Sequence, residues 1–147
     1  MNIYLPFIAT GLSLDKEFAQ LLLNHPEQQR EVMLYSDCLN LSAKKKVDLL
    51  IEYDVFSHTV NGQSANALVK EYCNLHDSYD LDKNYVEALI MGVKSPSEAL
   101  GYLVLSPSHR PLLLGEGDFF KQQNYFGIGY REHNNNYWYC IHCAHLI

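Results

Sequence analysis

The sequence lacks the signatures of the common enzyme classes. It contains no Gly-x-Ser-x-Gly elbow, no phosphate-binding P-loop, no dinucleotide fingerprint and no His-Glu-x-x-His helix. It also has no apolar run that approaches the roughly 20 residues needed to cross a bilayer. These absences argue against a conventional hydrolase and against a membrane-spanning protein.

Basic residues are scarce. Eleven Lys and Arg stand against 17 Asp and Glu, which gives a formal net charge of −6. Such a field repels nucleic acid, so no nucleic-acid partner is expected. The one basic cluster is Lys44-Lys45-Lys46, and we interpret it as the solvated face of a helix.

Cysteine is present but leaves the redox compartment open. The chain has four cysteines, which are Cys38, Cys73, Cys140 and Cys143. They permit two disulfides in three alternative pairings, and their spacing does not choose among these pairings.

The first ten residues are apolar, yet they lack the basic n-region and the small-residue cleavage site of a signal peptide. No signal peptide is therefore predicted.

Apolar periodicity predicts helices first and a small sheet towards the end of the chain. Helices are expected over 15–24, from Ser36 or Asp37 to near 54, from near 63 to 72, and from Ser95 to about 105. Strands are expected over 85–90, 125–131 and 137–145, and the turn at 134–136 joins the last two into a hairpin. This order indicates an α+β fold or a three-layer α/β/α arrangement.

Several polar residues stand out against this background. Glu87 lies in an apolar strand, and a buried carboxylate needs a partner because leaving it unpaired is costly. Arg110 is open to either a structural salt bridge or anion binding. The segment 140–145 contains four potential metal ligands, but strand alternation sends Cys140 and His142 to one face and Cys143 and His145 to the other. We therefore interpret its cysteines as buried strand residues.

Three segments in a fixed order show a family pattern. The first is Leu39-x3-Ala43-x12-Phe56-Ser57-His58, then Asn61-Gly62. The second is Val86-Glu87-Ala88-Leu89-Ile90-Met91-Gly92-x2-Ser95-Pro96-x-Glu98-Ala99. The third is Leu105-Ser106-Pro107-x-His109-Arg110-x2-Leu113-Leu114-Gly115, followed by Tyr125-Phe126-Gly127-Ile128-Gly129-Tyr130 and Tyr137-Trp138. Together they span roughly residues 18 to 145 and resemble the CAP (SCP/PR-1-like) domain superfamily, its bacterial members in particular.

The resemblance implies a fold and a site. The fold is a three-layer α/β/α sandwich of the α+β class with a small, mainly antiparallel sheet, formed by a single domain over residues 1–147 with an N-terminal extension over 1–14. His58, Glu87 and His109 match the two histidines and the first acid of the family's cleft. The place of the second acid falls on Leu105 or Ser106, which are not acids. We expect the two histidines within about 8 Å of each other, with Glu87 beside them.

Two functions from different classes follow from this resemblance. The preferred one is a binding or interaction protein whose cleft holds a divalent metal ion, such as Zn²⁺, or a small ligand. The metal ligands would be His58 and His109, because neutral imidazoles are good ligands for such ions. The alternative is a metal-assisted, protease-like hydrolase in which His58, Glu87 and His109 are the catalytic candidates. The lack of a second acid and of an evident nucleophile weighs against it.

Location and partners are expectations from the same resemblance. Similar proteins are commonly exported, which predicts an extracellular protein or a component of an extracellular or virion assembly. A protein partner or a larger assembly is accordingly expected.

Overall fold

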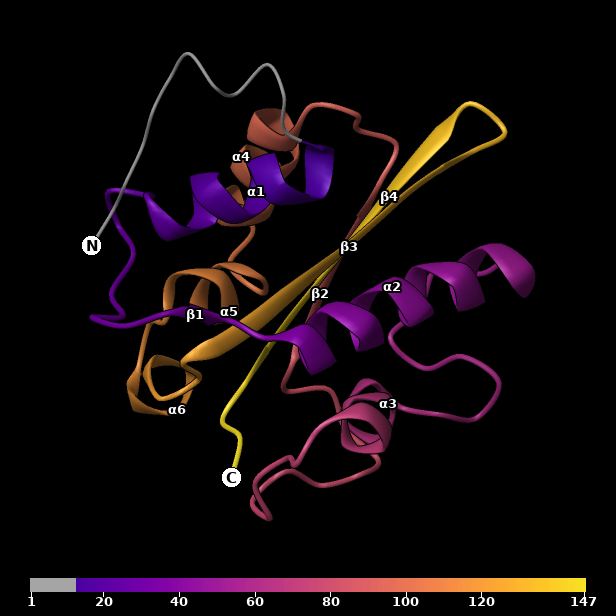
Figure 1. The fold of residues 1–147 in the computed structure, drawn as a ribbon. Coiled ribbons are helices and arrows are strands. Elements are labelled where there is room, and N and C mark those ends of the chain that lie inside the picture. The colour runs from indigo at the N-terminus through magenta and orange to yellow at the C-terminus, as the bar shows by residue number, and fades with distance from the viewer. Residues whose placement is uncertain (1–12) are drawn as a thin grey trace.

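The computed structural model describes residues 13–147, which form a four-stranded sheet covered by helices on both faces (Figure 1). The elements, in chain order, are α1 (Leu14–Leu23), β1 (Leu34–Tyr35), α2 (Asp37–Glu52), α3 (Ala65–Tyr72), β2 (Glu87–Met91), α4 (Pro96–Leu105), α5 (Arg110–Leu114), α6 (Asp118–Lys121), β3 (Tyr125–His133) and β4 (Asn136–Ala144).

The sheet has the strand order β1-β3-β4-β2 and is mainly antiparallel, as predicted. β3 and β4 pair from Tyr125 opposite Ala144 to His133 opposite Asn136. Asn134 and Asn135 form the turn with φ of 51° and 60°, a left-handed conformation that asparagine tolerates well. β2 pairs antiparallel with β4, whereas β1 pairs parallel with β3.

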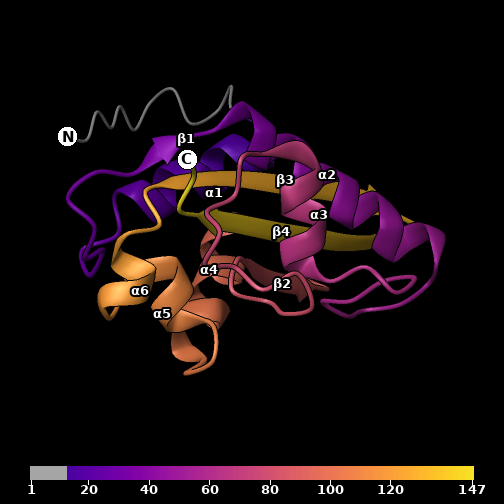
Figure 2. The same cartoon turned by 90° about the horizontal axis from the view of Figure 1, so that it is seen from below.

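The helices form two layers with the sheet between them. Figure 1 views the sheet nearly edge-on, with α2 and α3 on one side and α1, α4 and α5 on the other, and Figure 2 shows the same arrangement from below. On the α1 side, Phe18 and Leu22 pack against Ile128, Tyr139 and Ile141 of the sheet. Apolar residues of α2 and α3 pack on the opposite face. The α+β, three-layer α/β/α fold expected from the sequence is confirmed.

Two glycines bring α2 directly onto the sheet. A Cβ placed on Gly127 would lie 2.2 Å from the backbone nitrogen of Asn40, and one on Gly129 would lie 2.4 Å from the backbone oxygen of Ala43. A side chain at either strand position would therefore meet helix backbone. This close approach sets the distance from α2 to the sheet, and with it the position of every polar group that α2 points at β2 and β4.

The helices and long strands lie where the sequence predicts them, with small differences at their ends. β2 begins at Glu87 rather than at residue 85, and α1 already begins at Leu14, inside the predicted extension. The rest of that extension, residues 1–12, lies outside the described residues. Three short elements were not predicted: β1, α5 and α6. They are too short for periodicity to reveal, and β1 exists only because residue 34 pairs with residue 125.

The disulfide pairing that the sequence left open is Cys38 with Cys73, whose Cα atoms are 5.5 Å apart. It links the first turn of α2 to the end of α3. Cys140 and Cys143 are buried free thiols on opposite faces of β4, as strand alternation predicts. Among residues 13–147, no helix combines the length and the apolar composition of a bilayer-spanning segment.

Candidate functional site

Glu87 is the centre of a buried polar cluster between α2 and the sheet. Its side chain has no exposed surface, and both carboxylate oxygens are engaged. Oε1 lies 2.8 Å from His58 Nδ1 and 3.1 Å from Lys46 Nζ, while Oε2 lies 2.8 Å from His142 Nε2. The Cys140 thiol also donates to Oε2 at 3.7 Å, so Glu87 has four side-chain partners, and the expectation that a carboxylate in this strand needs a partner is confirmed.

These partners keep Glu87 ionised. Burial by itself would raise the pKa of this carboxyl, but hydrogen bonds from His142 and His58, together with the positive charge of Lys46, outweigh burial and lower the pKa from 4.5 to about 2. Glu87 is therefore an anion at any physiological pH. It holds its neighbours in place and has no proton to donate.

We expect the stability of the protein to fall steeply between about pH 4.5 and pH 2. The folded pKa of Glu87 is below the unfolded one, so the native state binds fewer protons, and the stabilisation is complete above pH 4.5 and lost as pH falls towards 2. The loss from this group is on the order of 3 kcal/mol. Urea unfolding across this pH range measures it, with Glu87→Gln as the comparison. If the slope of stability against pH is the same in the variant, Glu87 is not its source.

His142 extends the cluster to α2. Its Nδ1 lies 2.7 Å from Ser42 Oγ, and its Nε2 faces the anionic Glu87. The Ser42 hydroxyl also donates to the carbonyl of Leu39 at 3.0 Å, so both ring nitrogens of His142 and this hydroxyl have partners. Ser42, His142, Glu87 and His58 thus form one continuous chain of hydrogen bonds from buried helix to protein surface.

Lys46 corrects the sequence interpretation of the lysine cluster. The sequence predicts Lys46 on a solvated helix face together with Lys44 and Lys45. In the structure its side chain is only 1 % exposed, and its ammonium binds Glu87 and the carbonyl of His58. The signal for this was helical spacing, because position 46 lies three residues after Ala43 and four before Leu50, on the apolar stripe. The cation therefore belongs to the site.

His58 is held by the cluster and faces solvent. It lies in the segment after α2, where Lys46 fixes its carbonyl and Glu87 fixes its Nδ1. Its side chain is 41 % exposed, and its Nε2 forms no hydrogen bond with any described residue. Nε2 is therefore the ring nitrogen that the cluster leaves without a partner.

His109 is the residue that precedes α5, at the N-cap position of this helix. Its Nδ1 lies 2.8 Å from Ser106 Oγ. Partial burial lowers the pKa of His109, and its electrostatic interaction with His58 lowers it further, which favours the neutral imidazole at pH 7. The structure thus brings His58 directly to Glu87, whereas His109 makes no hydrogen bond to Glu87, and the separation of about 8 Å between the two histidines stays a prediction.

The expected place of the second acid holds a different group. Leu105 is 80 % exposed, while Ser106 holds His109 through its hydroxyl. A neutral hydroxyl orients the imidazole but cannot stabilise an imidazolium as a carboxylate would. Among the described residues, no carboxylate hydrogen-bonds His109.

Glu87, Cys140 and His142 also place potential ligand atoms within 4.8 Å of one another. Strand alternation places Cys140 and His142 on one face, as expected for this segment. Burial raises the pKa of the Cys140 thiol well above its usual range, and the negative charge of Glu87 raises it further. A protonated thiol and the adjacent ammonium of Lys46 both oppose a cation at this point. The group is best described as a hydrogen-bonded cluster.

Arg110 follows His109 and forms salt bridges. Its guanidinium lies 2.6 Å from Glu27 and 2.8 Å from Glu116, which are both carboxylates. The structural alternative from the sequence is the one observed.

Comparisons with known proteins concern the fold. No protein-family model matches the chain, and no curated protein sequence matches it. Among solved structures, an outer surface protein from Borrelia burgdorferi is similar with a TM-score of 0.69 and 15% identity, covering 100% of this chain and 98% of that one. An extracellular protein containing an SCP domain from Bacillus anthracis is similar with a TM-score of 0.62 and 11% identity, covering 97% of this chain. The present chain spans 45% of that longer one. The CAP (SCP-like) fold expected from the sequence is confirmed.

Proposed function

We propose that this chain, which has the CAP fold, is an extracellular binding protein whose cleft holds a divalent metal ion on His58 and His109 without chemical turnover. We propose Zn²⁺ as this metal ion. The observation that carries the proposal is that each imidazole is held through Nδ1, by Glu87 and by Ser106, and leaves Nε2 without a protein partner among the described residues.

This arrangement has the outer-shell pattern of metal-binding histidines. Such a histidine donates its second ring N–H to a carboxylate or another oxygen, which fixes the tautomer and the ring orientation. Here Glu87 and Ser106 are the outer groups, and the low pKa of Glu87 makes it a permanent acceptor. Glu87 itself is buried and fully engaged, so it orients His58 and is not a ligand. Water would complete the coordination of the ion.

The same geometry argues against turnover. A metal-assisted hydrolase needs a general base near the bound water. Both oxygens of Glu87 are occupied, and the second acid of the family pattern is absent. These features support a binding role for the cleft.

We expect the wild-type protein to bind Zn²⁺ and the variants His58→Ala and His109→Ala to lose this binding. Two protein ligands hold zinc more weakly than the three or four of established sites, so removal of either leaves too little to retain it. Isothermal titration calorimetry measures the affinity. Glu87→Gln keeps both ligands but weakens the orientation of His58, and a loss of about 10- to 100-fold is expected.

His133→Ala is the matched control for the zinc titration, because His133 is an exposed histidine outside this site. It should bind zinc as the wild type does. Equal zinc affinity in wild type, His58→Ala and His109→Ala would reject the proposed ligands. In a screen of peptide and ester substrates we expect no turnover, and turnover that both variants lose would favour the hydrolase alternative.

Two observations support the extracellular location. The disulfide between Cys38 and Cys73 suits an oxidising compartment, since structural disulfides are rare in reducing ones. Both structural neighbours are described as surface or extracellular proteins. Membership of a virion or another larger assembly stays a prediction from the sequence.

A further inference from the structure

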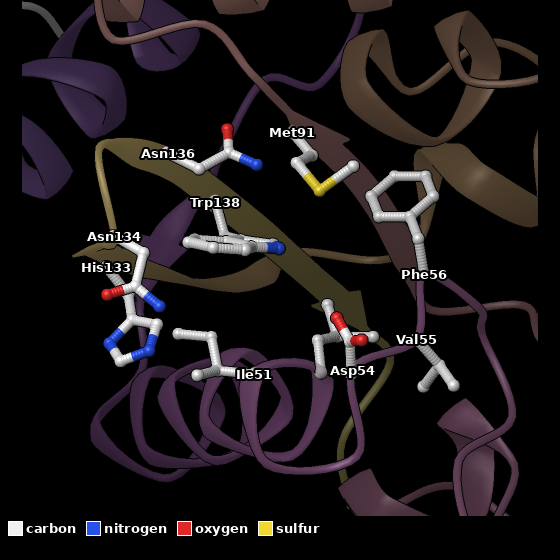
Figure 3. Close-up of a pocket in the computed structure, with 10 residues that line it drawn as sticks. Ile51, Asp54, Val55, Phe56, Met91, His133, Asn134, Asn136 and Trp138 are labelled. Carbon is white, nitrogen blue, oxygen red and sulfur yellow. The ribbon is translucent and has the colours of Figure 1, made fainter.

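A cavity separate from the histidine site opens between the end of α2, the end of β2 and the β3–β4 turn (Figure 3). Its volume is about 610 Å³, within the roughly 300–1,000 Å³ typical of small-molecule sites. Figure 3 shows the Trp138 ring in the middle of it, with Met91 and Ile51 on either side and Phe56 at one end. Neither zinc-site histidine lines this cavity.

Large apolar side chains converge here without being covered. Phe56 is 50 % exposed, Met91 is 42 % exposed and Val55 is 41 % exposed. Single exposed apolar residues are ordinary, but several around one concave site indicate a surface that binds an apolar part of a ligand. The cavity therefore has an apolar and aromatic wall suited to the carbon skeleton of a ligand.

The cavity has one carboxylate at its wall. Among the described residues, Asp54 is that carboxylate, no lysine or arginine lines the cavity, and His133 is its one other titratable side chain. The Asp54 side chain forms no ion pair with any described residue. On β3, Arg131 is already paired with Asp48 at 3.0 Å. Figure 3 shows the Asp54 carboxylate at the end of the cavity where Val55 and Phe56 lie.

We propose that this cavity binds a small organic cation, a protonated or quaternary amine carried on an apolar or aromatic body. The faces of Trp138 and Phe56 attract a cation through their ring quadrupoles, and Asp54 supplies the compensating charge. The negative charge of Asp54 repels an anion of the same shape, and a neutral molecule is stabilised only by the apolar contacts. This inference goes beyond the zinc site and does not depend on it.

The experiment uses Trp138 as its own reporter, because it is the only tryptophan in the chain. Three probes with the same phenylbutyl skeleton differ in charge: phenylbutylamine is a cation, phenylbutanol is neutral and phenylbutyrate is an anion. Each is titrated into the full chain while Trp138 emission is followed. We expect a saturable change with the amine, affinity for the alcohol about tenfold weaker, and no saturation with the acid.

Two variants test whether the amine binds in this cavity. Asp54→Asn removes the charge and keeps the backbone, since Asn tolerates the φ of 50° at this position. It should weaken the amine about tenfold and leave the alcohol unchanged. Phe56→Leu keeps an apolar side chain but removes the ring, and it should weaken the amine several-fold. Asp82→Asn, an exposed acid outside the cavity, is the matched control and should bind as the wild type does.

The outcomes decide the proposal. Equal affinity for the three probes would overturn the charge selectivity, and the absence of saturable amine binding would overturn the site itself. An Asp54→Asn protein that binds the amine as tightly as Asp82→Asn would show that the cation binds elsewhere. The amine titration is made without zinc, so a failed zinc titration leaves this test intact.

Discussion

Replacing Glu87 by alanine should destabilise the protein by about 3–5 kcal/mol at neutral pH. The reason is the charge left behind. The Lys46 side chain is 1 % exposed and its ammonium has Glu87 as its only ionic partner among the described residues, so the variant keeps an uncompensated cation in the core. His58 and His142 lose their acceptor as well. Urea unfolding gives the free energy. Glu31 is an exposed acid that forms no ion pair within residues 13–147, so Glu31→Ala should change this free energy by less than about 0.5 kcal/mol.

A double variant separates the charge from the lost volume. In Lys46→Met with Glu87→Gln both charges are gone while the side chains keep nearly the same size, so this protein should be more stable than Glu87→Ala. Together with the single variants Lys46→Met and Glu87→Gln, it completes a double-mutant cycle that gives the coupling energy of the ion pair. If the double variant is no more stable than Glu87→Ala, the unpaired lysine is not the cause of the destabilisation.

Replacing Gly127 by alanine should cost about 3 kcal/mol, at the upper end for overpacked cores. The added Cβ would lie 2.2 Å from Asn40 N and 2.3 Å from Leu39 C, and both are helix backbone that cannot rotate away. The helix must move off the sheet. Because α2 carries Lys46 and leads into the segment of His58, zinc affinity should fall together with the midpoint of thermal unfolding.

Gly101→Ala is the matched control for this effect. Gly101 lies in α4, and a Cβ there meets nothing within 4 Å. Alanine is the better helix former, so this substitution should be neutral or should stabilise by up to about 1 kcal/mol. A Gly127→Ala protein as stable as Gly101→Ala would mean that α2 does not rest on β3 as closely as the structure has it.

Local chemistry in the sequence accounts for most of the fold. Ser36 and Ser95 accept hydrogen bonds from Leu39 N and Glu98 N, so the predicted helix starts are real caps. The hairpin follows from alternating apolar residues on either side of an asparagine turn. These features depend on neighbours a few residues away, which is why the sequence alone reveals them. By contrast, β1 and the disulfide pair residues far apart in sequence.

The sequence alone likewise predicts only part of the candidate site. That Glu87, in an apolar strand, must have partners followed from the sequence, and so did the common face of Cys140 and His142. Which partners it has was decided by the packing of α2 on the sheet, which buries Lys46 beside it and aligns β2 with β4 so that His142 faces it. Likewise, the cation cavity combines three separated segments. A sequence specifies how often an apolar side chain recurs along one element, whereas only the packed elements decide which polar groups on different elements come within hydrogen-bonding distance.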